Sequence, residues 1–136
     1  MGSLFCLQAA HAALRERGGS VVLIGPSESL VGASGQVPLM TLAEGQRSLV
    51  KSAARQWGCL GIRLNWVGVA GSHYAPALAQ AAFPLSPELG DPPPALGVAP
   101  EPDGAVADAV AWLAGDAARG VTGASLNLDG GDWMVP

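Results

Sequence analysis

The chain has 136 residues, of which 49% are hydrophobic and 13% charged, and its mean hydropathy is +0.32. This length and composition predict one packed domain over residues 1–136 and exclude a disordered chain. The net charge of -4 and the pI near 4.9 exclude the large basic surface of a nucleic-acid-binding protein.

Thiols and hydropathy bear on the cellular compartment. Cys6 and Cys59 have no partners at metal-ligand spacing and are too few for a disulfide framework, so we expect free thiols in a reducing cytoplasm. No apolar run approaches the ~20 residues needed to span a bilayer. The first residues also lack the charged and apolar regions of a cleaved leader, and we expect a cytoplasmic protein without membrane contact.

A helix and a short strand come first along the chain. Residues 2–17 place Leu7 and Leu14 on one helical face, and two glycines then stop the helix. His11 shares that apolar face, which favours a packed or interface histidine over a metal ligand. The uncharged residues 21–24 are too few for a helix and predict a strand covered on both faces.

A long helix follows over residues 38–57. Pro38 suits its first turn because proline has no N–H to leave unbonded, and Gly58 predicts a left-handed cap after its end. Its apolar positions at spacings of three, four and seven, which we expect to be buried, are Leu39, Leu42, Leu49, Val50, Ala53 and Trp57. The basic positions on its exposed side, which we interpret as a solvated face, are Arg47, Lys51 and Arg55.

A second strand is predicted over residues 61–67, and a proline-rich segment comes after it. Residues 71–104 contain eight of the 11 prolines, so most of this stretch is predicted to be loop, with a short helix over 77–83. A loop this long inside a compact domain is typical of a lid, a binding loop or an arm that reaches another subunit.

The last predicted elements are a helix and a strand. Asp103 predicts an N-cap, and Val106, Val110 and Leu113 form the inward stripe of the helix. Residues 124–128 alternate as a third strand. The order of elements predicts an α/β fold in which three parallel strands are flanked by helices.

Three stretches, with the spacing between them, resemble the second half of a short-chain dehydrogenase/reductase, in the branch of the 3-oxoacyl-carrier-protein reductases. The stretches are FCLQAAHAALRERGGSVVLIG, LVKSAARQWGCLGIRLNWV and DAVAWLAGDAARGVTGASLNLDGG. The resemblance covers nearly the whole chain, and VTGASLNLDGG is its most specific part. It implies a partial Rossmann-like three-layer fold and, in complete members, hydride transfer between NAD(P) and an alcohol or ketone.

The resemblance also implies where cofactor and catalytic groups belong. The family binds cofactor phosphates on a glycine-rich turn, and this sequence contains no GxGxxG. The family's Ser, Tyr and Lys positions fall on Pro26, Leu39 and Ala43, which supply neither a general acid nor a group that lowers its pKa. A shift of one residue would bring Ser27 near the Ser position, with Ser29 close by.

The segment after the second strand matches the family only in part. Asn65 and Val67 match, but Val69 and Ala70 stand where the family has Pro-Gly, and Tyr74 stands where it has Thr. Positions that build the sheet match, while positions that touch cofactor or substrate do not. We therefore expect no catalytic, cofactor-binding or metal-binding residue, and NAD or NADP only where another chain supplies the phosphate-binding turn.

Other readings of the reactive residues are weaker. Tyr74 beside His73 suggests a displaced acid, but a loop aromatic that packs on the proline-rich segment explains it as well. Ser27, Ser29 or Ser34 with a histidine would suggest a hydrolase, yet no GxSxG elbow is present.

The end of the chain offers two further pairs of residues. Asp129 and Asp132 flank the terminal glycines and are better suited to accepting turn hydrogen bonds than to holding a metal. Trp112 and Trp133 are interpreted as core or contact residues, with contact favoured.

In complete members of the family, the strand that corresponds to residues 21–24 has a neighbouring strand on each side. The strands that precede it in the family are missing here, which leaves one of its edges unpaired. Its unpaired edge would require a cover. We expect a catalytically silent, truncated subunit that forms a homo-oligomer, or a hetero-oligomer with an active member of the family. The alternatives are a part of a split or longer NAD(P)-dependent oxidoreductase, and a small-molecule binding module with residues 71–104 as its lid.

Overall fold

The computed structural model describes residues 2–77 and 93–134. In this part of the chain three parallel strands form one sheet, in the order β1-β2-β3. The strands are β1 (Gly19–Pro26), β2 (Ile62–Val69) and β3 (Ser125–Leu128). The longer helices are α1 (Gly2–Leu14), α2 (Val37–Trp57) and α5 (Ala107–Ala114).

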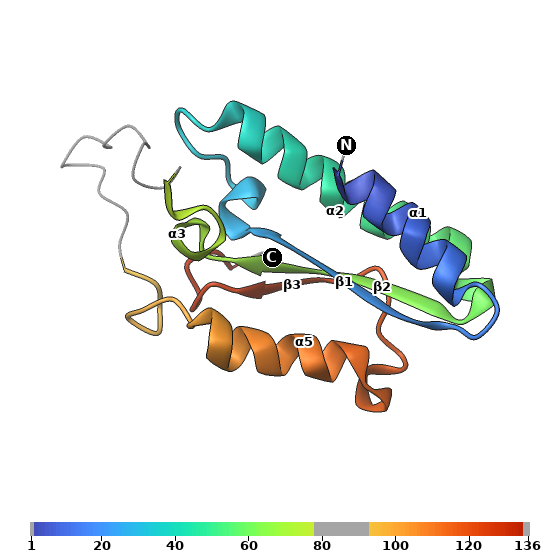
Figure 1. Cartoon of the computed structure of the whole chain (residues 1–136). Coiled ribbons are helices and arrows are strands. Elements are labelled where there is room, and N and C mark those ends of the chain that lie inside the picture. The colour runs from blue at the N-terminus through green and yellow to red at the C-terminus, as the bar shows by residue number, and fades with distance from the viewer. Residues whose placement is uncertain (1, 78–92, 135–136) are drawn as a thin grey trace.

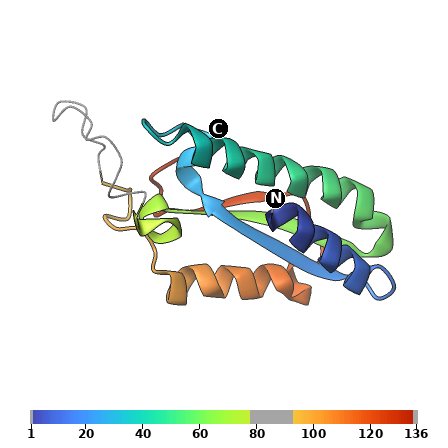
Figure 2. The ribbon, with the colours of Figure 1, turned by 45° about the horizontal axis from the view of Figure 1, so that its top comes forward.

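Helices cover the sheet on both faces. α1 and α2 lie on one face and α5 lies on the other, as Figures 1 and 2 show. The α/β class and the flanked, three-layered parallel sheet predicted from the sequence are confirmed. The short elements between them are η1 (Ser27–Leu30), η2 (Gly58–Leu60), α3 (Gly71–Tyr74), the π-helical turn η4 (Pro102–Val106) and η5 (Asp116–Ala118).

Hydrophobic side chains pack on both sides of β2. On the side of α1 and α2 the buried residues include Leu7, Val50 and Trp66. On the side of α5 they include Val67 and Leu113. β2 is the most deeply buried strand because β1, β3 and both helical layers surround it.

Trp66 fills the largest buried volume in the described core, and two glycines make room for it. A Cβ atom at Gly25 would lie 2.7 Å from Trp66 Cζ2, and one at Gly68 would lie 2.7 Å from Trp66 Cζ3. These glycines are opposite each other in the register of β1 and β2. The indole ring of Trp66 therefore packs closely against the backbone of β1 and β2 at these two glycines.

β1 has one unpaired side within the described residues. The N–H of Gly19 donates to the carbonyl oxygen of Gly61, on the side of β2. Because main-chain groups alternate in direction along a strand, those of Ser20, Val22 and Ile24 point away from β2. We call this row the open edge.

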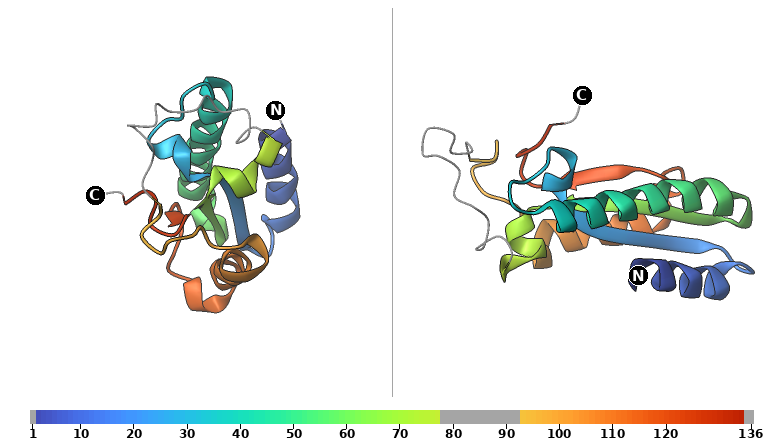
Figure 3. Two further views of the ribbon diagram at one scale, coloured as in Figure 1. Left: turned by 90° about the vertical axis from the view of Figure 1, so that its left-hand side faces the viewer. Right: turned by 90° about the horizontal axis from the view of Figure 1, so that it is seen from above.

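α1 lies on the outer side of β1, beyond the sheet, whereas α2 covers β1 and β2 (Figure 3). The sequence of α1 contains no Asp, Glu, Lys or Arg. Phe5 is 61% exposed and Leu4 41% exposed, so the helix is apolar on faces that the described chain leaves uncovered.

The buried face of α2 differs from the predicted one. Val50 and Ala53 are buried as expected, but Leu42 is 60% exposed and Leu49 is 36% exposed. The helix is rotated so that small residues and one methionine meet the sheet, which is possible because Trp66 already fills the space beneath it. The buried residues of α2 are Met40, Ala43, Val50, Ala53 and Ala54.

Several predicted boundaries and caps were wrong. α1 ends at Leu14, and β1 is longer than residues 21–24 and only partly covered, because its outer side has no neighbour in the described chain. Gly58 is right-handed, and the left-handed residue is Gly61, because a 3₁₀ turn extends the helix.

The predicted N-cap and loop helix need separate comment. Asp103 does not cap α5, because it lies inside the turn η4 and no side chain caps that turn or the helix. The predicted helix over 77–83 falls, except for Ala77, outside the described residues.

Candidate functional site

In parallel α/β sheets ligands bind beyond the carboxyl ends of the strands. Here η1 follows β1, α3 follows β2, and the turn at residues 129–131 follows β3. The first turns of α2 lie above η1 (Figure 1). These segments enclose the site that the sequence predicts to be blank.

The three positions that the resemblance assigns to Ser, Tyr and Lys bear hydrocarbon side chains. Pro26 ends β1 and is buried, and Ala43 on α2 is 2% exposed. Leu39, one helical turn before Ala43, is partly buried. None of these side chains can donate or accept a proton.

Glu28 in η1 bonds to the start of α3. Its Oε1 accepts a hydrogen bond of 2.6 Å from the N–H of Gly71. A Cβ at residue 71 would lie 2.7 Å from that oxygen, so only glycine admits the carboxylate here. The other oxygen, Oε2, is buried and has no hydrogen-bond partner in the described chain. Glu28 therefore ties the ends of β1 and β2 together.

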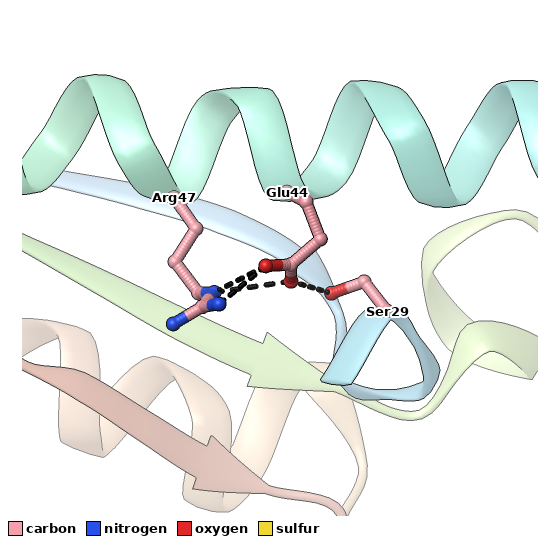
Figure 4. A network of polar contacts seen from close by, with 3 residues as sticks. All are labelled: Ser29, Glu44 and Arg47. Carbon is pink, nitrogen blue, oxygen red and sulfur yellow. Dashed lines mark hydrogen bonds and ion pairs between the residues drawn. The ribbon is translucent and has the colours of Figure 1, made fainter. Parts of the chain in front are cut away.

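Glu44 is the centre of a second polar contact, drawn in Figure 4. Its carboxylate accepts 3.0 Å hydrogen bonds from Nε of Arg47 and is ion-paired with Nη2, while Ser29 Oγ donates to it at 2.9 Å. The bond from Arg47 lowers the pKa of Glu44, against the raising effect of partial burial, and Ser29 lowers it further. The same pair raises the pKa of Arg47.

Asp129 closes the turn after β3. Its Oδ1 accepts from the N–H of Gly131 at 3.0 Å and its Oδ2 accepts from the N–H of Trp133 at 3.3 Å. This is the turn role predicted for Asp129. In residues 2–77 and 93–134, no group of three or more His, Cys, Asp or Glu side chains is placed to hold a metal ion.

The residues considered as alternative catalytic groups are either separated from one another or already in contact with other parts of the protein. Ser27 is fully buried, Ser29 donates to Glu44, and Ser34 is exposed on a loop. Tyr74 packs against the cluster between the sheet and α5, and most of the proline-rich segment predicted to contact it lies outside the described residues. In the described chain no hydrogen bond joins a serine to either histidine.

Other predicted residues take structural places. His11 stacks on Trp57 with ring centroids 4.8 Å apart, as expected for a packed histidine. Trp112 is 45% exposed, which suits the predicted contact role. Cys6 and Cys59 are exposed free thiols.

The charge of this site does not suit a dinucleotide. Glu28, Glu44 and Asp129 place three carboxylates at the carboxyl ends, and Arg47, the arginine in contact with them, is bound by Glu44. Cofactor phosphates require N–H donors or free cations. Among the described residues, the charged side chains of this site therefore offer no free cation to a cofactor phosphate.

Sequence reasoning missed Glu28 and the pair of Glu44 with Arg47. The pair had a signal, because Glu and Arg three residues apart are neighbours on a helix. Glu28 had none, because its partner Gly71 is 43 residues away.

Comparison with known proteins places this geometry in context. A family model described as enoyl-(acyl carrier protein) reductase matches residues 1–132. The chain is 36% identical over 132 residues to a 3alpha-hydroxysteroid dehydrogenase of Mediterraneibacter gnavus, covering 92% of this chain and 49% of that protein. It is 31% identical over 136 residues to the 3-oxoacyl-[acyl-carrier-protein] reductase FabG of Staphylococcus aureus, covering 98% and 53%.

A solved structure has a similar fold. The angucycline C-6 ketoreductase LanV with bound NADP superposes with a TM-score of 0.74 at 27% identity, covering 96% of this chain and 49% of that one. The chain thus spans about half the length of the curated relatives it matches. Within residues 2–77 and 93–134, no helix is long and apolar enough to cross a membrane.

Proposed function

Since the chain belongs to the short-chain dehydrogenase/reductase family, we propose that it is a catalytically silent, truncated member that serves as a partner subunit, for itself or for an active relative. The observation that carries this proposal is the contrast between a family framework with an open edge and the hydrocarbon side chains of Pro26, Leu39 and Ala43, the positions that the resemblance assigns to the catalytic residues. On this proposal residues 1–136 form a single truncated domain.

Catalytic silence is supported by the chemistry of the site. Loss of a general acid or base costs about 10²- to 10⁴-fold in rate. Of the carboxylates near Pro26 and Ala43, Glu44 is held by Arg47 and Ser29, and Glu28 is held through Oε1 by the N–H of Gly71.

A partner role is supported by the open edge. Ser20, Val22 and Ile24 present main-chain donors and acceptors along a strand of eight residues that carries no charge. Natural proteins protect such edges with charges, bulges or covering segments. In the described residues this edge carries no charge and no bulge, and α1, which lies on the outer side of β1, leaves its main-chain groups without hydrogen bonds, so we assign the edge to a partner strand.

A second contact surface runs between α1 and α2. A groove of about 300 Å³ lies there, with the hydrogen bond from Gln46 Nε2 to Ser3 Oγ between the two helices. Leu4, Leu42 and Leu49 line it and are all at least 36% exposed. An apolar, uncharged groove of this kind fits a helix of another subunit.

Light scattering of Ile24→Lys tests the partner role. We expect the natural chain to form oligomers, or to bind an active family member, and a lysine on the open edge to abolish strand pairing. Leu96→Lys is the matched control, because Leu96 is 76% exposed and outside the sheet. A natural chain that stays monomeric and binds no family member overturns the proposal, as does binding of a family member that is equally strong in the Ile24→Lys and Leu96→Lys variants.

Titration with NADH and NADPH tests catalytic silence. We expect no saturable change in the amide NMR signals of residues 27–30 or of α3, because the site offers no free cation to the cofactor phosphates. Saturable micromolar binding at those residues contradicts the proposal.

The second candidate is a part of a split or longer NAD(P)-dependent oxidoreductase that acts on a ketone or alcohol. It is favoured by the coverage of only about half of each relative. Co-expression with the adjoining coding sequence, followed by an assay of ketone-dependent NADPH loss, separates the two. Activity in the co-expressed complex supports this candidate, and its absence supports the first.

The exposed thiols support a reducing compartment for either candidate. Cys6 and Cys59 are unpaired and accessible, which is the ordinary state of cysteine in the cytoplasm. We propose the cytoplasm as its compartment.

A further inference from the structure

We propose that the chain binds the phosphate group of a phosphorylated small molecule at a surface depression beside α2. The depression lies toward the amino end of β3, whereas the site described above lies at the carboxyl ends of the strands. The depression has a volume of about 730 Å³ and lies between the second half of α2 and the turn before β3. We call it the basic depression. Its lining residues are Lys51, Ser52, Ala54, Arg55, Gln56, Thr122 and Gly123.

The position of the basic depression separates it from the site described above. Thr122 and Gly123 come just before β3, so they lie at the amino end of that strand. The family site lies at the carboxyl ends, near the first turns of α2. The two sites therefore share no residue and can be tested independently.

The helical side of the depression consists of hydrogen-bond donors. Lys51, Ser52, Arg55 and Gln56 occupy neighbouring positions one turn apart on α2, and all four are exposed. Lysine and arginine side chains donate and never accept, and the serine hydroxyl and glutamine amide can also donate. This set fits a ligand that is rich in acceptor oxygens.

The facing turn adds another donor and a closed floor. The Oγ1 of Thr122 accepts from the N–H of Leu64 at 3.1 Å, which leaves its hydroxyl proton to point elsewhere. A Cβ at Gly123 would lie 3.6 Å from that of Ala54, so the two small residues form the base. A larger residue at either place would fill the depression.

Lys51 and Arg55 are available for a ligand, unlike Arg47 and Arg63. In the described chain neither has a carboxylate within ion-pair distance, whereas Arg47 is paired with Glu44. Arg63 is also occupied, because it donates to main-chain carbonyls. No carboxylate lines the depression, although the chain carries a net charge of -4.

These properties suit a phosphate group. A phosphate group has enough oxygens to accept from both cations and from the hydroxyl of Thr122 or Ser52 at once. A volume of about 730 Å³ lies in the usual range for small-molecule sites, and leaves room for the rest of an organic molecule beyond its phosphate.

The test uses the full chain, with inorganic phosphate and pyrophosphate as probes at constant ionic strength and amide NMR shifts as the readout. We expect saturable shifts at residues 51–56 and at Thr122 and Gly123, and tighter binding of pyrophosphate. In Lys51→Gln/Arg55→Gln the affinity should fall by at least about tenfold, because charge-assisted bonds are lost.

The control is Arg17→Gln/Arg119→Gln, which changes the net charge equally at two exposed arginines outside the depression. We expect its affinity for pyrophosphate to change by less than about twofold, since distant exposed charges are screened. Equal weakening of both double variants, shifts located elsewhere, or no saturable binding overturns the proposal.

A third probe, NADPH, separates this proposal from the proposed function. NADPH binding supports the phosphate site if it shifts the amide signals of the residues that line the depression and is lost in Lys51→Gln/Arg55→Gln. NADPH binding that survives in this double variant and shifts the amide signals of residues 27–30 counts against catalytic silence. The phosphate site is then decided by the pyrophosphate titration.

Discussion

Glu44 shows how a single residue near the carboxyl ends of the strands supports the fold. Its carboxylate is bonded to Arg47 and Ser29, and its pKa is lowered mainly by Arg47. A folded-state pKa below that of the unfolded chain stabilises the fold fully above the unfolded value of about 4.3. This contribution is lost as the pH falls through the lower folded value.

The free energy of unfolding that is lost when Glu44 is replaced by Gln is therefore expected to depend on pH. At neutral pH the loss should be about 0.5–1 kcal/mol, because the pair is partly exposed. Below the unfolded pKa the difference should shrink toward zero. Urea denaturation across this pH range measures it, with Glu16→Gln as a control, since Glu16 makes only a 3.9 Å exposed pair. A loss that is constant with pH would refute this account.

Gly25 is predicted to be replaceable only together with Trp66. Gly25→Ala should cost about 1–3 kcal/mol, because its methyl group would overlap the indole. In a Trp66→Leu background the same change should cost at least about 1 kcal/mol less. Gly45→Ala, which meets open space on α2, should instead stabilise by up to about 1 kcal/mol. Additive losses of stability at positions 25 and 66 would contradict the fit.

At the scale of elements, Arg63 of β2 attaches the end of α5 to the sheet. Its Nη1 donates to the carbonyls of Leu113 at 2.8 Å and Ala118 at 3.0 Å, and its Nη2 donates to Gly115 at 3.1 Å. The last carbonyls of a helix otherwise lack partners within the helix, and a cation there also matches the helix dipole.

Arg63→Lys is expected to destabilise the protein by about 1–3 kcal/mol, because one ammonium group cannot reach all of these carbonyls. Denaturant unfolding measures the loss, and near-ultraviolet circular dichroism should show a loosened Trp112 on α5. Arg119→Lys, on an exposed side chain, should have little effect. Equal stability of both variants would show that α5 is held by its apolar face.

The order and type of the main elements were predictable because each has its own periodicity. The strands have short apolar runs between glycines, and α2 has strong helical spacing. The buried face of α2 was not predictable, because it depends on Trp66 from another element. The assignment of Pro26, Leu39 and Ala43 to the catalytic positions comes from the resemblance and stays a prediction, whereas the contact of Glu28 with Gly71 depends on the folded chain.

At the scale of the whole molecule, hydrogen exchange is expected to report the open edge. In the unassembled chain the amides of Ser20, Val22 and Ile24 should exchange at least about tenfold faster than those of Val21 and Leu23, which face β2. Binding of a partner strand should slow the fast set. A uniform rate along β1 before assembly would show that the edge is already covered.

The overhang of α1 past β1 limits the stoichiometry of assembly. If two copies joined their β1 strands about a twofold axis, the strands would lie ~4.8 Å apart. Both α1 helices would then fall on the same face near that axis, where their bodies need about 8–10 Å between axes. Self-association through like edges is thus sterically barred, so this rim should accept one unlike strand, and copies of the chain should meet through their helices instead.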